Sequence, residues 1–294
     1  MTTLAVQFPT PLSLFHFAVL GSTLLFSSVA SDAAPLEAGL GLQLWSLRAP
    51  AKENPFAALD LARSYGVTNV ETAGTWGLSA DAFSAALRAR RLNVVSAHYG
   101  YDRLQQDLRG VIAEARAFGA EYVVVPWLKN QDGVFDAAAV ARDFDRWGAK
   151  LRAAGLKLGY HPHGFEFRPL PDGGTRFDTL VTQTKPENVC FEMDVFWVVH
   201  AGVDPVALLN KYPDRWRLMH LKDLRRGADV GTHTGRAPAT DNVPVGEGVI
   251  DWPAVLAAAQ KVGVVHCLIE DETTEPLKSI PASLAYLRNL GLAR

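Results

Sequence analysis

The chain of 294 residues has almost no excess of charge and no extended basic run. Its 29 lysines and arginines are balanced by 31 aspartates and glutamates, which leaves a formal net charge of −2. Proteins that bind nucleic acid usually gather Lys and Arg on one face, where these side chains neutralise phosphates. The sequence therefore predicts no nucleic-acid partner.

Cysteine is also scarce. Cys190 and Cys267 are the two that occur, and each lies inside an apolar run. Two such residues provide no disulfide framework, and they do not identify the redox compartment. We interpret both as buried free thiols, which pack like small apolar side chains.

The first 30 residues contain no Lys, Arg, Asp or Glu. Residues 12–25 are apolar, and small residues follow at 28–33, which is typical of a secretory signal peptide too short for a membrane span. The basic residues that usually precede such a segment are missing, and Pro9 and Pro11 interrupt it. A mis-assigned start, an uncleaved apolar anchor and a cytoplasmic protein therefore stay open as alternatives. We expect export to the periplasm or the exterior, no stable membrane span in the mature chain, and a leader over residues 1–35 outside the fold.

From residue 40 to residue 294, short apolar runs alternate with helix-like stretches. The runs lack the strict alternation of a half-exposed strand, which favours parallel strands covered on both faces. The helix-like stretches begin at capping residues such as Asn54 and Ser79, and several end at glycine. Eight such pairs predict one (β/α)₈ barrel domain over residues 40–294. The predicted strands are 41–47, 67–72, 92–98, 120–126, 156–162, 188–193, 217–222 and 264–270.

A doubly wound open sheet is the structural alternative for alternating strands and helices. That fold would place a glycine-rich phosphate-binding turn after its first strand. The segment GLQLWSLRAP at 41–50 contains no such turn. The closed barrel is therefore the preferred prediction.

Ionisable residues occur where the last four predicted strands end. Glu166, Asp194, His220 and Glu270 follow or end strands five to eight. Neighbouring strands lie about 4.8 Å apart, so these side chains could share one ion, and three carboxylates crowded together without a cation would be unfavourable. The group predicts a divalent-cation site with positions open for water or substrate. Singly, each residue could instead be a loop cap or a satisfied polar group.

Several short motifs follow one another along the second half of the chain. They are HPHGFEF at 161–167, Asp194 with Trp197 and then GVDP at 202–205, HLKD at 220–223, GEG and DW within 246–252, and EDE at 270–272. In this order they resemble the motifs of the xylose isomerase-like barrel superfamily, the sugar phosphate isomerase/epimerase family. One departure is that the family's His-Asn-His triplet reads His161-Pro162-His163 here.

The resemblance implies an enzyme with one divalent ion, Mn²⁺, Mg²⁺, Co²⁺ or Zn²⁺, held by Glu166, Asp194, His220 and Glu270. It also implies that Glu166 and Glu270 move the proton beside a carbonyl, through a metal-stabilised enediolate. The function expected first is therefore a sugar isomerase or epimerase. The alternative is a metal-dependent lyase or hydrolase of 3-keto-glycosides, which removes the same proton and eliminates the aglycone. An exported protein would favour this alternative.

Other functions on the same fold agree less well with the sequence. Phosphodiester cleavage of the endonuclease IV type would need several metals, more His ligands and a basic surface. A sugar-binding barrel without catalysis would not need all four ligand types.

Further residues are expected to contact a small-molecule carbohydrate. His161 and His163 are two apart, so on an extended strand they point the same way. Lys222 could contact a substrate oxygen, or it could pair with Asp223. Each remaining residue could also serve packing alone, and a homo-oligomer stays open. The other expected substrate contacts are His98, Glu71, Trp127, Trp197 and Glu247.

Overall fold

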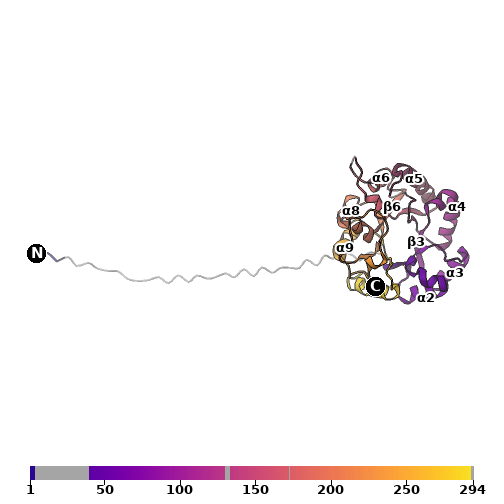
Figure 1. Ribbon diagram of the computed structural model, residues 1–294, viewed down its shortest axis with the longest axis horizontal. Helices are drawn as coiled ribbons and strands as arrows, with labels where there is room; N and C mark the ends of the chain where they lie inside the picture. The colour runs from indigo at the N-terminus through magenta and orange to yellow at the C-terminus, as the bar shows by residue number, and fades with distance from the viewer. Residues whose placement is uncertain (4–39, 130–132, 172, 293–294) are drawn as a thin grey trace. The chain divides into compact units, whose positions relative to one another are not determined.

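The computed structural model describes residues 1–3, 40–129, 133–171 and 173–292. Residues 4–35 of the expected leader lie outside the described residues. Eight parallel strands close into a barrel in the order β1-β10-β7-β6-β5-β4-β3-β2 (Figure 1). Closure confirms the (β/α)₈ prediction and excludes the doubly wound open sheet. The strands are β1 (Leu40–Gln43), β2 (Asn69–Ala73), β3 (Asn93–His98), β4 (Tyr122–Val125), β5 (Lys157–Tyr160), β6 (Val189–Asp194), β7 (Trp216–Leu221) and β10 (His266–Ile269).

Helices surround the strands (Figure 1). Asn54 begins α2 by accepting the N–H groups of Phe56 and Ala57, and Ser79 begins α3 in the same way. Satisfying these first N–H groups is the reason such residues favour helix starts. The helices are α1 (Arg48–Glu53), α2 (Pro55–Ser64), α3 (Ala80–Ala89), α4 (Tyr101–Phe118), α5 (Ala137–Ala153), α6 (Arg176–Thr182), α7 (Val195–His200), α8 (Pro205–Lys211), α9 (Trp252–Lys261) and α10 (Pro276–Asn289).

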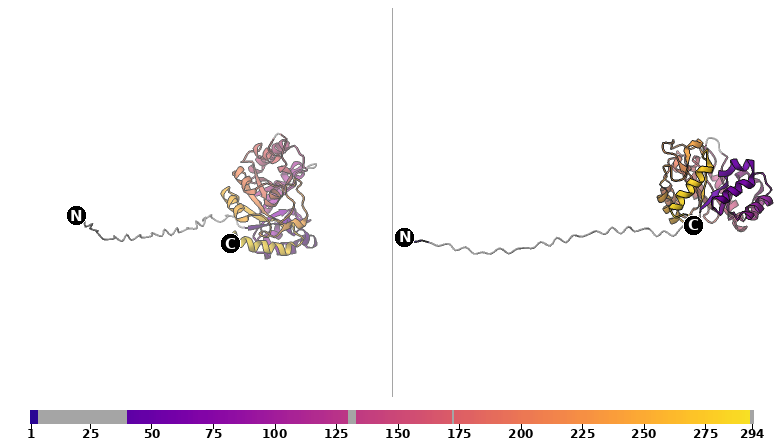
Figure 2. Two further views of the ribbon diagram at one scale, coloured as in Figure 1. Left: turned by 60° about the vertical axis from the view of Figure 1, so that its left-hand side comes forward. Right: turned by 90° about the horizontal axis from the view of Figure 1, so that it is seen from below.

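The last helix returns to the first part of the barrel. Arg288 of α10 donates to the carbonyl oxygen of Tyr65 at the end of α2, at 2.8 Å. Figure 2 shows α10, coloured yellow, beside the indigo and purple helices. The ring of helices is therefore continuous around the strands.

Short elements depart from the prediction. The expected strand at 41–47 ends at Gln43, because the side chain of Gln43 accepts the N–H of Trp45 and starts the 3-10 helix η1 (Leu44–Leu47). Two six-residue helices, α1 and α7, were not predicted. Among the described residues, none of the helices combines the length and the apolar composition needed to span a bilayer. Cys190 and Cys267 are buried free thiols, as expected.

The strand register places polar side chains inside the barrel in two layers, one above the other along the barrel axis. Glu192 and Asp194 of β6 are two residues apart, so they point to the same face. Asp194 lies opposite His220 of β7. His220 Nε2 lies 2.6 Å from Glu71 Oε2, although β7 and β2 are not neighbours. These side chains therefore meet across the barrel interior.

One buried carboxylate holds the long connection after β7. Asp223 begins the two-stranded sheet of β8 (Asp223–Leu224) and β9 (Asn242–Val243). Its carboxylate accepts the N–H groups of Gly246 and Gly248 at 2.9 and 3.2 Å, and the indole N–H of Trp252 at 2.8 Å. The connection is thus fixed at both ends beside the strand that carries His220.

Candidate active site

Three of the four expected metal ligands come together at the carboxyl ends of the strands. Asp194, His220 and Glu270 meet there with His161, and one donor atom from each lies within 4.8 Å of every other. His220 Nδ1 lies 3.4 Å from Glu270 Oε2 and 4.0 Å from Asp194 Oδ2. His161 Nε2 lies 3.9 Å from Asp194 Oδ2. We call His161, Asp194, His220 and Glu270 the mouth quartet.

Two atoms of the mouth quartet are buried without a hydrogen-bond partner among the described residues, Asp194 Oδ2 and His220 Nδ1. Buried polar atoms almost always have a hydrogen-bond partner. Two neighbouring buried atoms without one, 4.0 Å apart, therefore indicate a ligand that binds between them. Two carboxylates and two imidazoles are common ligands of divalent transition metals. The residues present therefore fit a divalent cation.

Glu166 does not join the quartet, contrary to the expectation. Its carboxylate accepts the hydroxyl of Tyr160 and, at 3.0 Å, the N–H of His163. After β5 the chain turns through the 3-10 helix η2 (Phe165–Phe167), which breaks the strand alternation and directs the side chain away from the other three. Glu166 is fully buried, and this burial raises its pKa to about 8.

His161 takes the place expected for Glu166. It is the first residue after β5, and it is 2 % exposed. The sequence predicted His161 as a substrate contact or as a partner of a ligand. The signal for its role was its position directly at the end of the strand, whereas Glu166 lies six residues beyond Tyr160.

Lys222 provides positive charge at the mouth. Its ammonium lies 3.2 Å from Glu270 Oε2, and it also donates to Glu272. Burial alone would lower the pKa of Lys222, but the carboxylates of Glu270, Asp194 and Glu272 raise it above its usual value. The expected alternative, a pair with Asp223, does not form, because Asp223 holds the connection after β7.

A cavity of about 430 Å³ opens above the quartet. This volume suits a ring-sized ligand with substituents. Five of the expected substrate contacts line it, together with Glu270. The lining residues are Trp45, Ala73, His98, Pro126, Trp127, His161, His163, Trp197, Glu270 and Glu272.

His163 is the lining imidazole that is not part of the quartet. Its Nδ1 is buried without a hydrogen-bond partner among the described residues. The rings of Trp127 and Trp197 lie 4.7 and 5.3 Å from its own. Burial, with the nearby positive charge of Lys222, holds the pKa of His163 well below its usual value. The ring is therefore neutral, and one of its nitrogens carries a free lone pair.

Three expected contacts are not among the residues that line the cavity, and Lys222 at the mouth is one of them. Glu247 is exposed on the connection after β7, away from the lining residues. Glu71 is fully buried beneath the cavity, where it bonds His220, Gln43 and Ser96.

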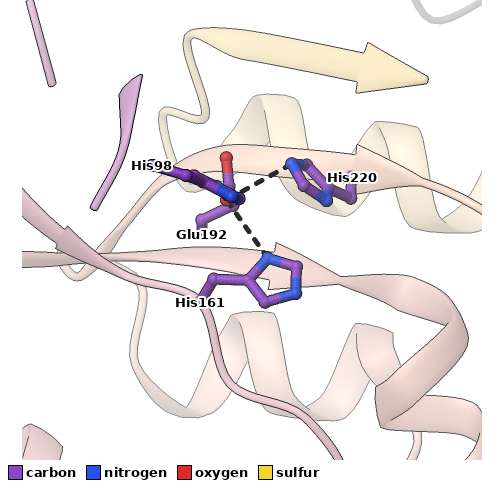
Figure 3. Close-up of side chains that lie close together, drawn as sticks. All are labelled: His98, His161, Glu192 and His220. Carbon is purple, nitrogen blue, oxygen red and sulfur yellow. Dashed lines mark hydrogen bonds and ion pairs between the residues drawn. The ribbon is translucent and has the colours of Figure 1, made fainter. Parts of the chain in front are cut away.

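A second carboxylate, Glu192, lies beside Glu71 and was missed by the sequence analysis. Figure 3 shows the imidazoles of His98, His161 and His220 gathered around it. Glu192 Oε2 lies 3.0 Å from His98 Nε2, 3.1 Å from His161 Nδ1 and 3.3 Å from His220 Nε2. Glu192 lies inside an apolar run, but its spacing of two from Asp194 was the signal that could have found it. We call Glu71 and Glu192 the floor carboxylates.

The floor carboxylates remain ionised despite their burial. Burial alone would raise the pKa of Glu192, but the charge of His220 and the hydrogen bonds of the three imidazoles hold it well below its usual value. For Glu71, burial and the charge of Glu192 act in the same unfavourable direction, and His98 and His220 lower its pKa. The floor is therefore a compact set of negative acceptors facing imidazole donors.

Solved structures with the same fold include sugar enzymes. A sugar phosphate isomerase/epimerase from Parabacteroides distasonis is similar at a TM-score of 0.72 and 22% identity, over 92% of this chain and 99% of that one. The IOLI protein with a bound zinc atom is similar at a TM-score of 0.65 and 15% identity, over 86% and 97%. At these identities the similarity shows the fold.

Among curated proteins, an inosose dehydratase from Lacticaseibacillus casei is 29% identical over 154 residues. The match covers 50% of each protein, so the chain spans about half the length of this relative. A family model, described as the xylose isomerase-like TIM barrel, matches residues 59–290. The chain therefore belongs to the xylose isomerase-like TIM barrel family.

Proposed function

We propose that this barrel is a metal-dependent lyase. It removes the proton beside a carbonyl on a polyhydroxylated ring and then eliminates the substituent on the next carbon. The observation that carries the proposal is the mouth quartet beneath a 430 Å³ cavity, with two of its buried atoms unpaired. The dehydratase name of the sequence relative supports elimination as the outcome.

The mouth quartet would hold the cation. A divalent cation there would polarise the substrate carbonyl and make the neighbouring C–H group more acidic. Lys222 stays protonated, and its ammonium can stabilise negative charge that develops on a substrate oxygen. Trp127 and Trp197 flank His163 and narrow the cavity around the ring.

His163 is the group assigned to move the proton. Its unpaired Nδ1 accepts the proton from the carbon beside the carbonyl, and the electron pair of that C–H bond forms the enediolate. The bond to the leaving oxygen then breaks, and protonated His163 returns the proton to that oxygen. The products are an unsaturated ketone and water, or an unsaturated ketone and the released alcohol of a glycoside.

Epimerisation would start with the same proton transfer but needs a second group on the other face of the ring. The two glutamates expected for that task were Glu166 and Glu270. Glu166 is bonded to Tyr160 and the N–H of His163 instead of lining the cavity. The absence of Glu166 from the lining residues supports the one-base elimination over the sugar isomerase or epimerase expected first.

The test is incubation with an inosose and with a 3-keto-glucoside in D₂O, with added Zn²⁺, Mn²⁺, Co²⁺ or Mg²⁺. We expect an enone absorbance in the ultraviolet, or release of the aglycone, that depends on the metal. Deuterium in a recovered epimer, with neither enone nor free aglycone, would show epimerisation and contradict the lyase proposal.

We also propose that the chain is exported. The uncharged apolar segment at 12–25 and the small residues at 28–33 support this assignment. Mass spectrometry of the amino terminus of the protein from its native cell tests it. We expect cleavage near residue 30, and an intact Met1 on a cytoplasmic product would contradict it.

A further inference from the structure

Each of the two histidines of the mouth quartet has one ring nitrogen facing the mouth and the other facing the floor. His161 places Nε2 toward Asp194, at 3.9 Å, and Nδ1 toward Glu192, at 3.1 Å. His220 places Nδ1 toward Glu270, at 3.4 Å, and Nε2 toward Glu192, at 3.3 Å. Both rings therefore connect the mouth to the same oxygen of one floor carboxylate.

One oxygen of Glu192, Oε2, lies 3.0 to 3.3 Å from three imidazole nitrogens, which is the geometry of an acceptor shared by several donors. His161 and His220 therefore each present an N–H group to the floor. A neutral imidazole that donates one N–H has a lone pair on its other nitrogen. A cation at the mouth displaces the second proton of a charged ring. With the remaining N–H on Nδ1 of His161 and on Nε2 of His220, the lone pairs that bind the cation lie on the nitrogens that face the mouth. Histidines that bind metals usually donate their second N–H in this way, which fixes the ring and strengthens the ligand.

We propose that Glu192 is a positioning residue that orients both His161 and His220 as ligands for the cation of the mouth quartet. The proposal rests on the proposed metal-dependent function and deepens it. Glu192 reaches no cavity-lining position, so it acts through the two rings. Glu71 supports only one of them, since its Oε2 contacts His220 at 2.6 Å and does not contact His161.

The floor could itself be considered as a metal site, because His98, His161, Glu192 and His220 also offer donor atoms within 4.8 Å of one another. Two cations at once would require His161 and His220 to bind through both nitrogens, each ring losing both N–H protons. At the floor every imidazole nitrogen already faces a carboxylate or, for His98 Nδ1, the amide of Gln43. Among the described residues, the floor has one buried atom without a hydrogen-bond partner, Glu192 Oε1. The mouth has two, Asp194 Oδ2 and His220 Nδ1. The geometry therefore assigns the cation to the mouth.

The experiment measures Zn²⁺ affinity of the full chain by competition with a chromophoric chelator. Glu192→Gln is compared with Glu71→Gln, which removes a floor charge from His220 and His98 but not from His161. We expect Glu192→Gln to weaken Zn²⁺ binding about 10- to 100-fold, and Glu71→Gln to weaken it less. Circular dichroism and thermal melting check that both variants fold.

A second measurement needs no variant. In the Zn²⁺-loaded wild-type chain, ¹⁵N shifts of the imidazoles should show Zn²⁺ on Nε2 of His161 and on Nδ1 of His220, with protons on the opposite nitrogens. Zn²⁺ on Nδ1 of His161 or Nε2 of His220 would place the cation at the floor and overturn the assignment. His98→Asn gives the same decision, since it should change Zn²⁺ affinity by less than about threefold at a mouth site.

The outcomes separate this inference from the proposed function. Wild-type affinity in folded Glu192→Gln, with unchanged ring shifts, overturns the positioning role alone. Zn²⁺ binding that is weakened as expected, without turnover of either ketone, contradicts the proposed reaction and supports the positioning role. A wild-type chain that binds no Zn²⁺ overturns both.

Discussion

The mouth and the floor of this barrel both contain buried carboxylates and imidazoles, but they differ in how many of these polar atoms have hydrogen-bond partners. At the floor, Glu71 and Glu192 face imidazole, amide and hydroxyl donors on nearly every oxygen. At the mouth, Asp194 Oδ2 and His220 Nδ1 have no such partner among the described residues. A satisfied polar cluster holds side chains rigidly, whereas an incomplete one is prepared for a ligand. The comparison distinguishes the mouth residues, which are available to bind a ligand, from the floor residues, which hold neighbouring side chains in position.

The largest expected effect comes from the mouth. Asp194→Asn keeps the shape of the side chain but removes a charged donor from the quartet. We expect metal content after dialysis to fall to background and turnover to fall to that of the metal-stripped wild type. Metal analysis and kcat/KM measure the two effects. Full metal retention together with full activity would remove Asp194 from the mouth quartet.

His163→Gln should separate chemistry from metal binding at the same mouth. The ring that takes the proton is lost, so kcat should fall by about 10²- to 10⁴-fold, the usual contribution of a general base. Metal content should be unchanged, because His163 is not a member of the quartet. Loss of the metal in folded His163→Gln would instead make this residue part of the metal site.

Lys222→Gln tests the counter-charge of the mouth. Removing an ammonium that lies 3.2 Å from Glu270 Oε2 leaves the carboxylates more attractive to a cation. We expect the metal to bind more tightly by up to about tenfold, while kcat falls because the ammonium no longer stabilises charge on the substrate. Weaker metal binding in a folded variant would show that Lys222 supports the site by packing against Trp197 and Phe196.

The smallest effect on activity is expected for Glu166→Gln, because that carboxylate lies outside the cavity. Stability should respond to pH instead. With a folded pKa of about 8 and an ordinary value of 4.5, folded Glu166 keeps a proton that the unfolded chain releases between these pH values. Rising pH therefore destabilises the wild type in this window, by at most about 1.4 kcal/mol per pH unit.

Thermal melting of the wild type and Glu166→Gln at pH 5 and pH 8 measures this difference. The variant should lose less stability than the wild type between the two pH values. A fall of kcat by a factor of a thousand in Glu166→Gln would return Glu166 to the role that the motif resemblance implied.

The barrel could be predicted from the sequence because its strands are buried on both faces. Continuous apolar runs and capping residues such as Asn54 carry that information locally. The short helices α1 and α7 could not be predicted in this way, since six residues hold less than two turns of any periodic pattern.

The site could be predicted only in part. Asp194, His220 and Glu270 lie at or directly after strand ends, where position alone indicates direction. Glu166 lies beyond a 3-10 turn, and no spacing rule gives the direction of a side chain after such a turn. Glu192 was not predicted, because a single charged residue inside an apolar run gives the run the appearance of a core strand. It nevertheless shares its strand face with Asp194.

The attachment of the connection after β7 has a consequence for engineering. Asp223 binds the backbone at 246 and 248 and the indole of Trp252, so the return of the chain to the barrel is fixed independently of what lies between β8 and β9. The segment at 226–238 lies between these anchors, and it packs on the site, since Gly235 lies against His163 and Trp127 and Thr232 bonds His200. A library of exchanges in this segment would therefore vary the surroundings of His163 while the strands keep their register.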